Sequence, residues 1–345
     1  MRFVDNLTHS LFALTLARTP LRRAGRGTTL TLLLASNAPD SDIVVAVARG
    51  GEAYLSAHRG SSHGPLGILA LGFVVAVLVY AIRKRGRPPT PFLNLVGVAL
   101  IGTLGHVLMD LPTSYGTRLL SPFDRTWYAI DLMPIIDVYL LGLLATGLIV
   151  GRMNVAFRTH IAVGVVALMV ANYALRTGLH AMALGRAGGD GAAILNWWPD
   201  APSPKLPSDY LCPVSPCTLG IAAMPTFGSP LTWRIVRQLS TGYEIREIDL
   251  LRGADRPVAW LPHNADPAVD VARQASVSQS LLAFSRFPAA RVEMLPHETT
   301  VRIRDVRFLD VPVSGRSEEF RPGGLFAVRV RLDPHGRILE DRFGN

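Results

Sequence analysis

Long apolar runs fill the first half of the chain, whereas apolar and charged residues alternate over much of the second half. A helix needs roughly 20 apolar residues to cross a bilayer. We therefore predict membrane spans over residues 28–48, 65–82, 91–111, 133–151 and 159–181, after a shorter helix at 5–19. The short helix carries Asp5 and His9, and its basic cluster follows the apolar stretch instead of preceding it, so we expect it to be retained and not cleaved as a signal peptide.

The second half predicts a small α+β domain. "PLTWRIVRQ" followed by "GYEIREIDLLR" is typical of paired strands, and "ASVSQSLLAFSRFP" is typical of a helix. "LFAVRVRLDPHGRILEDRF" predicts a hairpin that turns at 333–336. The expected organisation is a helical membrane bundle over 1–183, with about five spans, and an α+β domain over 184–345, which is long enough for a core of its own.

The charge distribution predicts a topology. The chain has 345 residues, 49% of them hydrophobic and 18% charged, with a mean hydropathy of +0.29 and a net charge of +9. Basic residues cluster in three short loops, at 18–26, 83–87 and 152–158, and such loops mark the cytoplasmic side of a membrane. The loops 49–64 and 112–132 and the α+β domain are then extracytoplasmic. Because topology accounts for much of the charge, we expect no nucleic-acid partner.

Both cysteines, Cys212 and Cys217, fall in the predicted α+β domain. An oxidising outer compartment permits a disulfide between them. This domain shows no nucleophile motif and no glycine-rich phosphate loop, so we expect it to cover a site or to select a substrate.

Ionisable residues inside or beside the apolar segments all fall at one depth in the predicted topology. They are His9, Asp40, Asp42, His58, His63, His106 and Asp110, with Asp131 and Asp137 at the start of the fifth span. Ionisable groups in a membrane are costly and are usually paired or functional. His106 and Asp110 share one helix face, since they are four residues apart. Nitrogen and oxygen donors without thiolate favour one or two ions of zinc, or of iron or manganese.

Other interpretations stay open at this point. Asp40 after Pro39, and Asp131 before the fifth span, are also typical of helix caps, whereas Asp137 lies a turn further in. A row of buried carboxylates and histidines also occurs in the proton or ion relays of transporters. Histidines in an outer loop favour a site at the membrane surface over a path across it.

Roles within this predicted site follow from residue type. Asp40 or Asp42 is the candidate general base, and Arg59 is the candidate group for negative charge on a substrate. The loop "LPTSYGTRLLSPFDRT" lies beside Asp110 and either packs at the headgroup interface or contacts substrate. The candidate substrate contacts are Thr113, Tyr115, Arg118 and Arg125, with Asp131 and Asp137 beyond the loop.

Five motifs occur in order over residues 1–150: "DNLTHSLFALTLA", "NAPDSD", "HRGSSHGPLG", "GHVLMDLPTSYGTRLLSPF" and "DLMPIID". Together they resemble the YbcI/YdjM-like bacterial family of membrane-bound metal-dependent hydrolases, which is distantly similar to zinc-dependent phospholipase C and P1 nuclease. The resemblance implies zinc bound by His and Asp. The implied ligands are His9, Asp40, Asp42, His58, His63, His106 and Asp110. Gly64 stands where that family usually has serine, which removes one hydroxyl.

We therefore expect an integral membrane hydrolase in which metal-activated water attacks a phosphoester at the outer leaflet. A membrane lipid is the expected substrate because the residues lie at headgroup depth. The alternatives are hydrolysis of a lipid carboxylic ester or amide, and a metal-dependent transporter or channel. The sequence leaves the substrate, the number of ions and the oligomeric state open.

Overall fold

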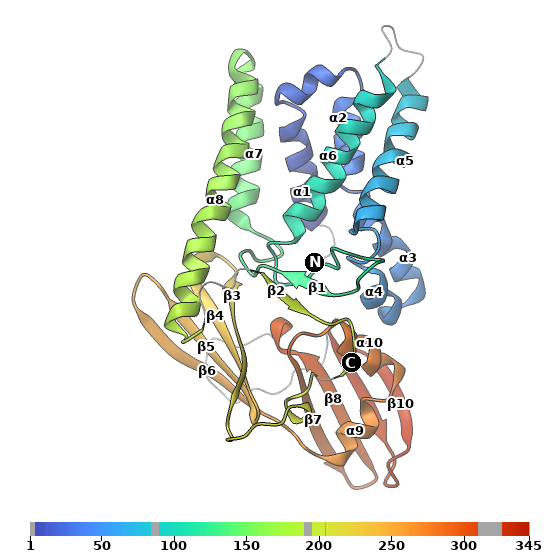
Figure 1. The fold of residues 1–345 in the computed structure, drawn as a ribbon, viewed down its shortest axis with the longest axis vertical. Helices are drawn as coiled ribbons and strands as arrows, with labels where there is room; N and C mark the ends of the chain where they lie inside the picture. The colour runs from blue at the N-terminus through green and yellow to red at the C-terminus, as the bar shows by residue number, and fades with distance from the viewer. Residues whose placement is uncertain (1–3, 84–89, 190–194, 204, 310–325, 345) are drawn as a thin grey trace. The chain divides into compact units, whose positions relative to one another are not determined.

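The computed structural model describes residues 4–83, 90–189, 195–203, 205–309 and 326–344 (Figure 1). The chain divides into two compact units. The helical unit comprises Met1–Val44 and His58–Gly178, and the β unit comprises Val45–Ala57 and Leu179–Asn345. The division inside the last long helix lies a few residues before the boundary predicted at residue 183.

The helical unit is built from the N-terminal helices and from four longer apolar ones. Its elements are α1 (Val4–Leu16), η1 (Pro20–Ala24), α2 (Thr28–Ala35), η2 (Pro39–Ser41), the start of α3 (Asp42–Arg49), α5 (Pro65–Arg83), α6 (Phe92–Asp110), β1 (Trp127–Ala129), α7 (Val138–Met153), η3 (Val155–Phe157) and most of α8 (Arg158–Arg186). α6 packs against α2 and α5, and α1 packs against α2 and α7. The buried apolar core of this unit includes Leu32, Leu95 and Leu144.

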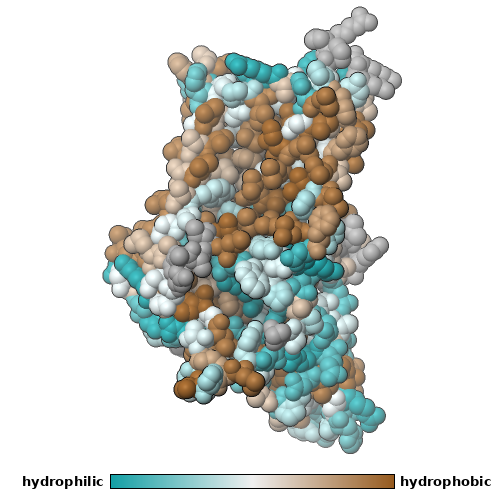
Figure 2. Space-filling view, in the orientation of Figure 1, coloured by the Kyte–Doolittle hydropathy of each residue, from teal (hydrophilic) through white to brown (hydrophobic). Residues whose placement is uncertain are grey.

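Within the described residues, three helices are long and apolar enough to cross a membrane: α5, α6 and the continuous stretch Val155–Arg186 that contains α8. They correspond to the spans predicted over 65–82, 91–111 and 159–181. The fourth, α7, is apolar but shorter, and it begins at Val138 instead of residue 133. Hydrophobic side chains cover much of the visible face of these helices, as expected for a surface in contact with lipid (Figure 2).

The prediction of one continuous span over 28–48 is wrong. α2 ends at Ala35, and Ser36 is its C-cap residue. Pro39 then begins the short helix η2, where its missing N–H and fixed φ suit a first helical position. The two apolar halves of the predicted span are therefore separate short helices. Asp40 lies in η2, and Asp42 begins α3 directly after it.

The β unit contains two four-stranded antiparallel sheets, with strand orders β3-β4-β5-β6 and β10-β9-β8-β7. Its elements are α4 (Gly51–Ala57), β2 (Asn196–Trp198), η4 (Pro207–Asp209), β3 (Thr218–Thr226), β4 (Ser229–Leu239), β5 (Gly242–Asp249), β6 (Ala254–Pro262), α9 (Pro267–Ala272), α10 (Ser276–Phe284), β7 (Pro288–Leu295), β8 (Glu298–Asp305), η5 (Val306–Phe308), β9 (Ala327–Leu332) and β10 (Ile338–Phe343). The buried side chains of Val236, Tyr243 and Ile245 lie in its core.

Several patterns in this half predicted the elements correctly. β4 and β5 pair as expected, α10 occupies the predicted helix, and β9 and β10 form the predicted hairpin. The amide of Gly336 donates to the carbonyl of Asp333 across that turn, at 2.9 Å. Cys212 and Cys217 are joined by a disulfide.

Candidate metal centre

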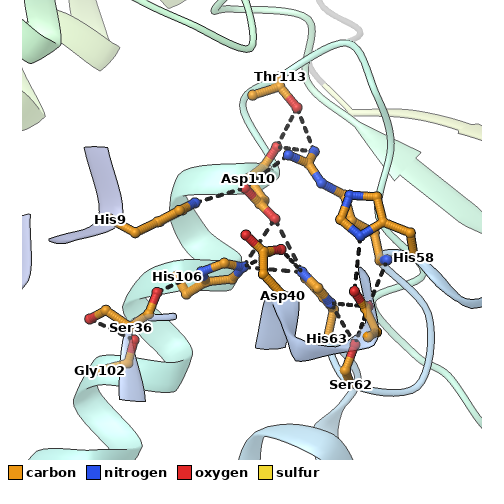
Figure 3. Close-up of polar contacts among 12 residues, drawn as sticks. His9, Ser36, Asp40, His58, Ser62, His63, Gly102, His106, Asp110 and Thr113 are labelled. Carbon is orange, nitrogen blue, oxygen red and sulfur yellow. Dashed lines mark hydrogen bonds and ion pairs between the residues drawn. The ribbon is translucent and has the colours of Figure 1, made fainter. Parts of the chain in front are cut away.

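His106 and Asp110 lie in the last two turns of α6, and both are buried (Figure 3). The Nδ1 atom of His106 lies 2.8 Å from the carbonyl oxygen of Ser36. A carbonyl only accepts, so Nδ1 carries the proton and the neutral ring has its lone pair on Nε2. That Nε2 atom faces two carboxylates, 3.4 Å from Oδ1 of Asp40 and 3.4 Å from Oδ2 of Asp110. A carbonyl that fixes the tautomer in this way is typical support for a metal-binding imidazole.

Gly102, one turn before His106, allows α6 to approach α2 closely. A Cβ at this position would lie 2.7 Å from the Cβ of Ala35 and 3.4 Å from the amide nitrogen of Ser36. Any larger residue would separate the helices and move the carbonyl that holds His106. The sequence analysis missed Gly102. Its signal is a small residue within an apolar helix, which often marks close packing in membrane bundles.

The segment "HRGSSHG" forms a tight turn that brings His63 into the same cluster. The amide of His63 donates to the carbonyl of Gly60 at 2.9 Å. Gly64 follows, and a Cβ there would lie 1.8 Å from the carbonyl oxygen of Ser121. The backbone at residue 64 is therefore too close to this loop for any residue except glycine. This packing gives a physical reason for glycine at the position where the resembled family has serine.

The second nitrogen of His63 is fixed by the protein as well. The Ser62 hydroxyl donates to Oδ2 of Asp42 at 2.7 Å, so its oxygen is left to accept from Nδ1 of His63 at 2.9 Å. The Nε2 lone pair of His63 then points toward Nε2 of His106, at 3.2 Å. Burial lowers the pKa of His63, although the neighbouring Asp110 opposes this effect. Two neutral imidazoles that direct lone pairs at one point are the arrangement that a bound cation stabilises.

Carboxylates complete this arrangement. Oδ2 of Asp110 lies 3.2 Å from Nε2 of His63, and it is a buried oxygen with no hydrogen-bond partner among the described residues. Oδ1 of Asp40 lies 3.8 Å from the same nitrogen. Carboxylate oxygens of Asp40 and Asp110 therefore face the same point as the two lone pairs.

Asp42 begins α3 and supports the neighbouring histidine. Its Oδ1 lies 3.0 Å from Nδ1 of His58, and its Oδ2 also accepts from the amide of Arg59 at 3.2 Å. A carboxylate bound to one imidazole nitrogen orients the ring and makes the other nitrogen a better donor to a metal.

Two overlapping groups of side chains are able to hold a metal ion. The first consists of Asp40, His63, His106 and Asp110, and the second of Asp40, Asp42 and His58. Within each group the ligand atoms lie within 4.8 Å of one another, and all of these residues except Asp42 are buried. Asp40 belongs to both groups, and a shared carboxylate is the usual bridge in two-metal sites. The residues fit a metal that prefers nitrogen and oxygen ligands.

His9 lies beside the first group. Its ring stacks on that of His106, with centroids 3.9 Å apart and planes inclined by 27°. Its Nε2 atom is 3.4 Å from Oδ1 of Asp110, the oxygen that faces away from the two imidazole lone pairs. His9, a predicted metal ligand, therefore lies at the cluster, but it contacts Oδ1 of Asp110 and not the oxygen that faces His63 and His106.

The guanidinium of Arg59 is directed at Asp110. Nη2 donates to Oδ1 of Asp110 at 3.0 Å, and Nη1 donates to the hydroxyl of Thr113 at 2.8 Å. The guanidinium also lies over the ring of Tyr115, 4.8 Å from its centroid. Arg59 is buried and has a φ of 53°, a conformation that non-glycine residues seldom adopt. These contacts favour a role in holding Asp110. The predicted contact with substrate charge stays a prediction.

The predicted substrate residues divide into two sets. Thr113 and Tyr115 are buried at the cluster, and the Tyr115 ring lies 5.4 Å from that of His58. Arg118 is buried, and its guanidinium lies over the ring of Trp127 at 4.4 Å. Arg125 is exposed. The structure thus brings two of these four side chains directly to the candidate metal ligands.

Asp137 is a helix cap. Its Oδ1 accepts from the amide of Leu140 at 2.7 Å, at the start of α7, and its Oδ2 accepts from the buried guanidinium of Arg176. The alternative that Asp131 caps this helix is wrong, since Asp131 lies six residues earlier, buried and with a φ of 60°. The sequence analysis missed Arg176, whose signal is one arginine in an apolar helix.

Comparison with known proteins gives a family match that includes all residues of this site. The model of the family described as "YdjM inner membrane protein" matches residues 4–182, which is more than half of the chain. A curated relative, the uncharacterized protein YfhP of Bacillus subtilis (strain 168), is 28% identical over 111 residues. That match covers 32% of this chain and 32% of the relative, so the chain spans about a third of the length of YfhP. No solved structure matches the chain.

Proposed function

The chain belongs to the YdjM inner membrane protein family, and from that premise we propose that it is a metal-dependent hydrolase of the inner membrane. The expected resemblance to YdjM-like proteins is confirmed. Hydrolysis and the similarity to phospholipase C and P1 nuclease stay predictions. The proposed reaction is cleavage of a phosphoester in a lipid or lipid-like substrate at the outer leaflet, with zinc as the first candidate metal.

The observation that carries the proposal is the sharing of Asp40 between two groups of metal ligands. Two-metal sites bridged by a carboxylate are common in enzymes that hydrolyse phosphoesters. The burial of His63, His106 and Asp110 excludes the bulk of the solvent, which strengthens electrostatic interactions with a substrate.

A lipid substrate is supported by the position of the site along α6. His106 and Asp110 lie at the C-terminal end of a helix that is long and apolar enough to cross a bilayer. The end of such a helix lies near headgroup depth. The disulfide between Cys212 and Cys217 supports an oxidising, extracytoplasmic compartment for the β unit.

The protein residues have separable tasks in this proposal. When bound, a transition-metal ion supplies Lewis acidity and lowers the pKa of a water ligand toward about 7. Asp40, His63, His106 and Asp110 would hold one ion, and Asp40 with Asp42 and His58 a second. Arg59 keeps Asp110 in place. Of the two candidate bases, Asp42 lies at the edge of the cluster, where a carboxylate oxygen is able to exchange a proton with water.

The experiment that tests the proposal combines metal analysis with a lipid substrate panel. Full-length protein purified without chelator is expected to carry near-stoichiometric zinc, manganese or iron, and to release phosphate or a phosphorylated headgroup from lipid phosphoesters. Asp110→Asn should abolish both properties. The matched control is Asp124→Asn, which removes one exposed carboxylate held by Thr126. Metal-free wild-type protein with full activity, or cleavage of carboxylic esters alone, would contradict the proposal.

A further inference from the structure

A cavity lined by arginines lies at the end of the helical unit where α2 and α6 begin. Its volume is about 360 Å³, within the range of ligand pockets. Arg22 comes from η1, Arg26 from the loop before α2, and Arg83 from the end of α5. Among the described residues that line the cavity, none is acidic. Three arginines from three separate elements therefore line this one cavity.

This cavity is separate from the candidate metal centre. Thr90 and Asn94, at the start of α6, bind the loop that forms the cavity wall, whereas His106 and Asp110 lie at the other end of the helix. Sixteen residues separate Asn94 from Asp110 along the sequence, which is about 24 Å of α-helix. Because α6 is long enough to cross a membrane, its two ends lie near opposite interfaces.

The loop that carries Arg26 is held by specific hydrogen bonds. The carbonyl of Ala24 accepts from Asn94 Nδ2 at 3.0 Å, that of Gly25 from the Thr28 hydroxyl at 2.7 Å, and that of Arg26 from the Thr90 hydroxyl at 2.8 Å. Three successive carbonyl oxygens, the groups that would repel an anion, are thus engaged by protein donors. The arginine-lined wall is a built feature and not a loose surface turn.

The start of α2 adds to the positive potential. Gly27 is the N-cap residue of this eight-residue helix, with a φ of 100° and no side-chain cap. Gly27 and Thr28 both line the cavity. The amides of a first helical turn and the positive end of the helix dipole favour an anion at such a position. Together with the three arginines they define the ligand as anionic, and guanidinium forks suit phosphate oxygens.

The apolar surroundings point to a lipid as the source of that phosphate. Leu78 and Ile82 are 50% and 57% exposed on α5, one turn apart, and Arg83 follows Ile82 at the end of this helix. Leu30 lines the cavity itself. A phosphate beside an exposed apolar helix surface is the chemistry of a phospholipid headgroup with its acyl chain along the protein. We propose that the cavity of Arg22, Arg26 and Arg83 binds the headgroup of an anionic membrane phospholipid, independently of the proposed hydrolysis.

The test is lipid binding to the full-length protein in detergent, measured by native mass spectrometry. Phosphatidylglycerol, phosphatidylcholine and inorganic phosphate are the three probes. Phosphatidylglycerol is expected to bind at least tenfold more tightly than phosphatidylcholine. Arg22→Gln should weaken that binding at least tenfold, and Arg83→Gln gives a second test from another helix. The matched control is Arg23→Gln, since Arg23 is a neighbouring exposed arginine of η1 that does not line the cavity.

The outcomes separate the proposal from a general attraction between basic residues and anionic lipid. Loss of binding in Arg22→Gln and Arg83→Gln, with a change below twofold in Arg23→Gln, supports the site. Equal losses in Arg22→Gln and Arg23→Gln would overturn it, as would equal binding of the two lipids. Displacement of phosphatidylglycerol by stoichiometric inorganic phosphate would also overturn it, because the ligand would then be free phosphate.

Discussion

The imidazole of His106 donates a hydrogen bond from Nδ1 to the carbonyl oxygen of Ser36, 70 residues earlier in the sequence, at 2.8 Å. This contact joins the end of α2 to the last part of α6. It decides which nitrogen of His106 faces Asp40 and Asp110, and hence whether the ring is able to bind a metal. Its geometry depends on how closely the two helices pack.

Helix packing at Gly102 should therefore control metal affinity. In Gly102→Ala the new Cβ would lie 2.7 Å from the Cβ of Ala35, so α2 and α6 must separate. We expect metal affinity to fall about 10–100-fold, the usual effect of disturbing support around a metal ligand. Unfolding should become easier by about 1–3 kcal/mol, as for an overpacked core. Competition with a fluorescent chelator measures the affinity.

The control for this variant lies on the same helix. A Cβ at Gly97 meets nothing within 4 Å, so Gly97→Ala makes the same chemical change without crowding. It should bind metal as the wild type does and be equally or slightly more stable, because alanine favours the helix. If Gly102→Ala and Gly97→Ala bind metal equally, the approach of the two helices does not govern the site.

Asp40 and Asp42 should respond differently to loss of charge. Asp40 belongs to both ligand groups, so Asp40→Asn is expected to remove most of the metal and all activity. Asp42 contacts His58, Ser62 and the amide of Arg59. We expect Asp42→Asn to retain metal in the first group and to lose turnover about 10²-fold or more, the usual scale for general base catalysis.

Metal content and turnover must be measured on the same preparations of these variants. A transporter would hydrolyse nothing, and either variant would instead alter ion flux in liposomes. Full metal content and full activity in both variants would show that the two aspartates are structural and that the assignment of the base is wrong.

The sequence predicted those parts of the site that lie close together along the chain. His106 and Asp110 are four residues apart in an unbroken apolar helix, and α6 does place both in one cluster. The depth argument, in which separate acids and histidines meet at one level, also brought Asp40 and His63 to the same point.

The sequence could not predict contacts that depend on how distant segments pack. The apolar residues on both sides of Pro39 resemble one span, because hydropathy averages over a short break. The carbonyl of Ser36 and the flat face at Gly102 gain their roles only once α2 meets α6. Asp137 was placed among substrate contacts because nothing in the sequence indicates its partner Arg176, 39 residues away.

Arg59 should act through Asp110. Arg59→Gln removes the donors to Oδ1 of Asp110 and to Thr113, and leaves a buried carboxylate with less support. We expect metal affinity to fall by about tenfold or more. Arg125→Gln, at an exposed position, is the charge-matched control. If Arg59→Gln binds metal normally and only the KM for anionic lipid rises, Arg59 contacts substrate, as the sequence analysis proposed.

Topology is testable with reporters that work on one side of the membrane. A reporter fused after residue 155 should indicate that this point lies on the cytoplasmic side, because Arg152 and Arg158 flank it. A reporter at the C-terminus should show the outer side, and Cys212 and Cys217 should resist thiol reagents until they are reduced. A cytoplasmic C-terminus would move the site to the inner leaflet and remove the support that the disulfide gives.

The stability of the β unit should rise with pH because of Lys205. This side chain is buried, and its Nζ donates to the carbonyl of Ala283 at 2.9 Å. Burial, reinforced by the charge of Arg307, lowers the pKa of Lys205 to about 7, from an ordinary value of 10.5. Below pH 7 both the folded and the unfolded chain carry the charge, and its full burial cost is present. Above pH 7 the folded lysine loses its proton while the unfolded one keeps it.

The unfolded chain therefore binds more protons between pH 7 and 10.5, and stability increases across this window. We expect the free energy of unfolding to increase by an amount on the order of 2 kcal/mol between pH 7 and 9. Urea unfolding at several pH values, monitored by the β-sheet infrared band, measures this increase. Lys205→Met should flatten the slope, because it removes the titrating group. Arg252→Met, which replaces an exposed cationic side chain by the same residue, should keep it. An unchanged slope in Lys205→Met would assign the pH dependence to another group.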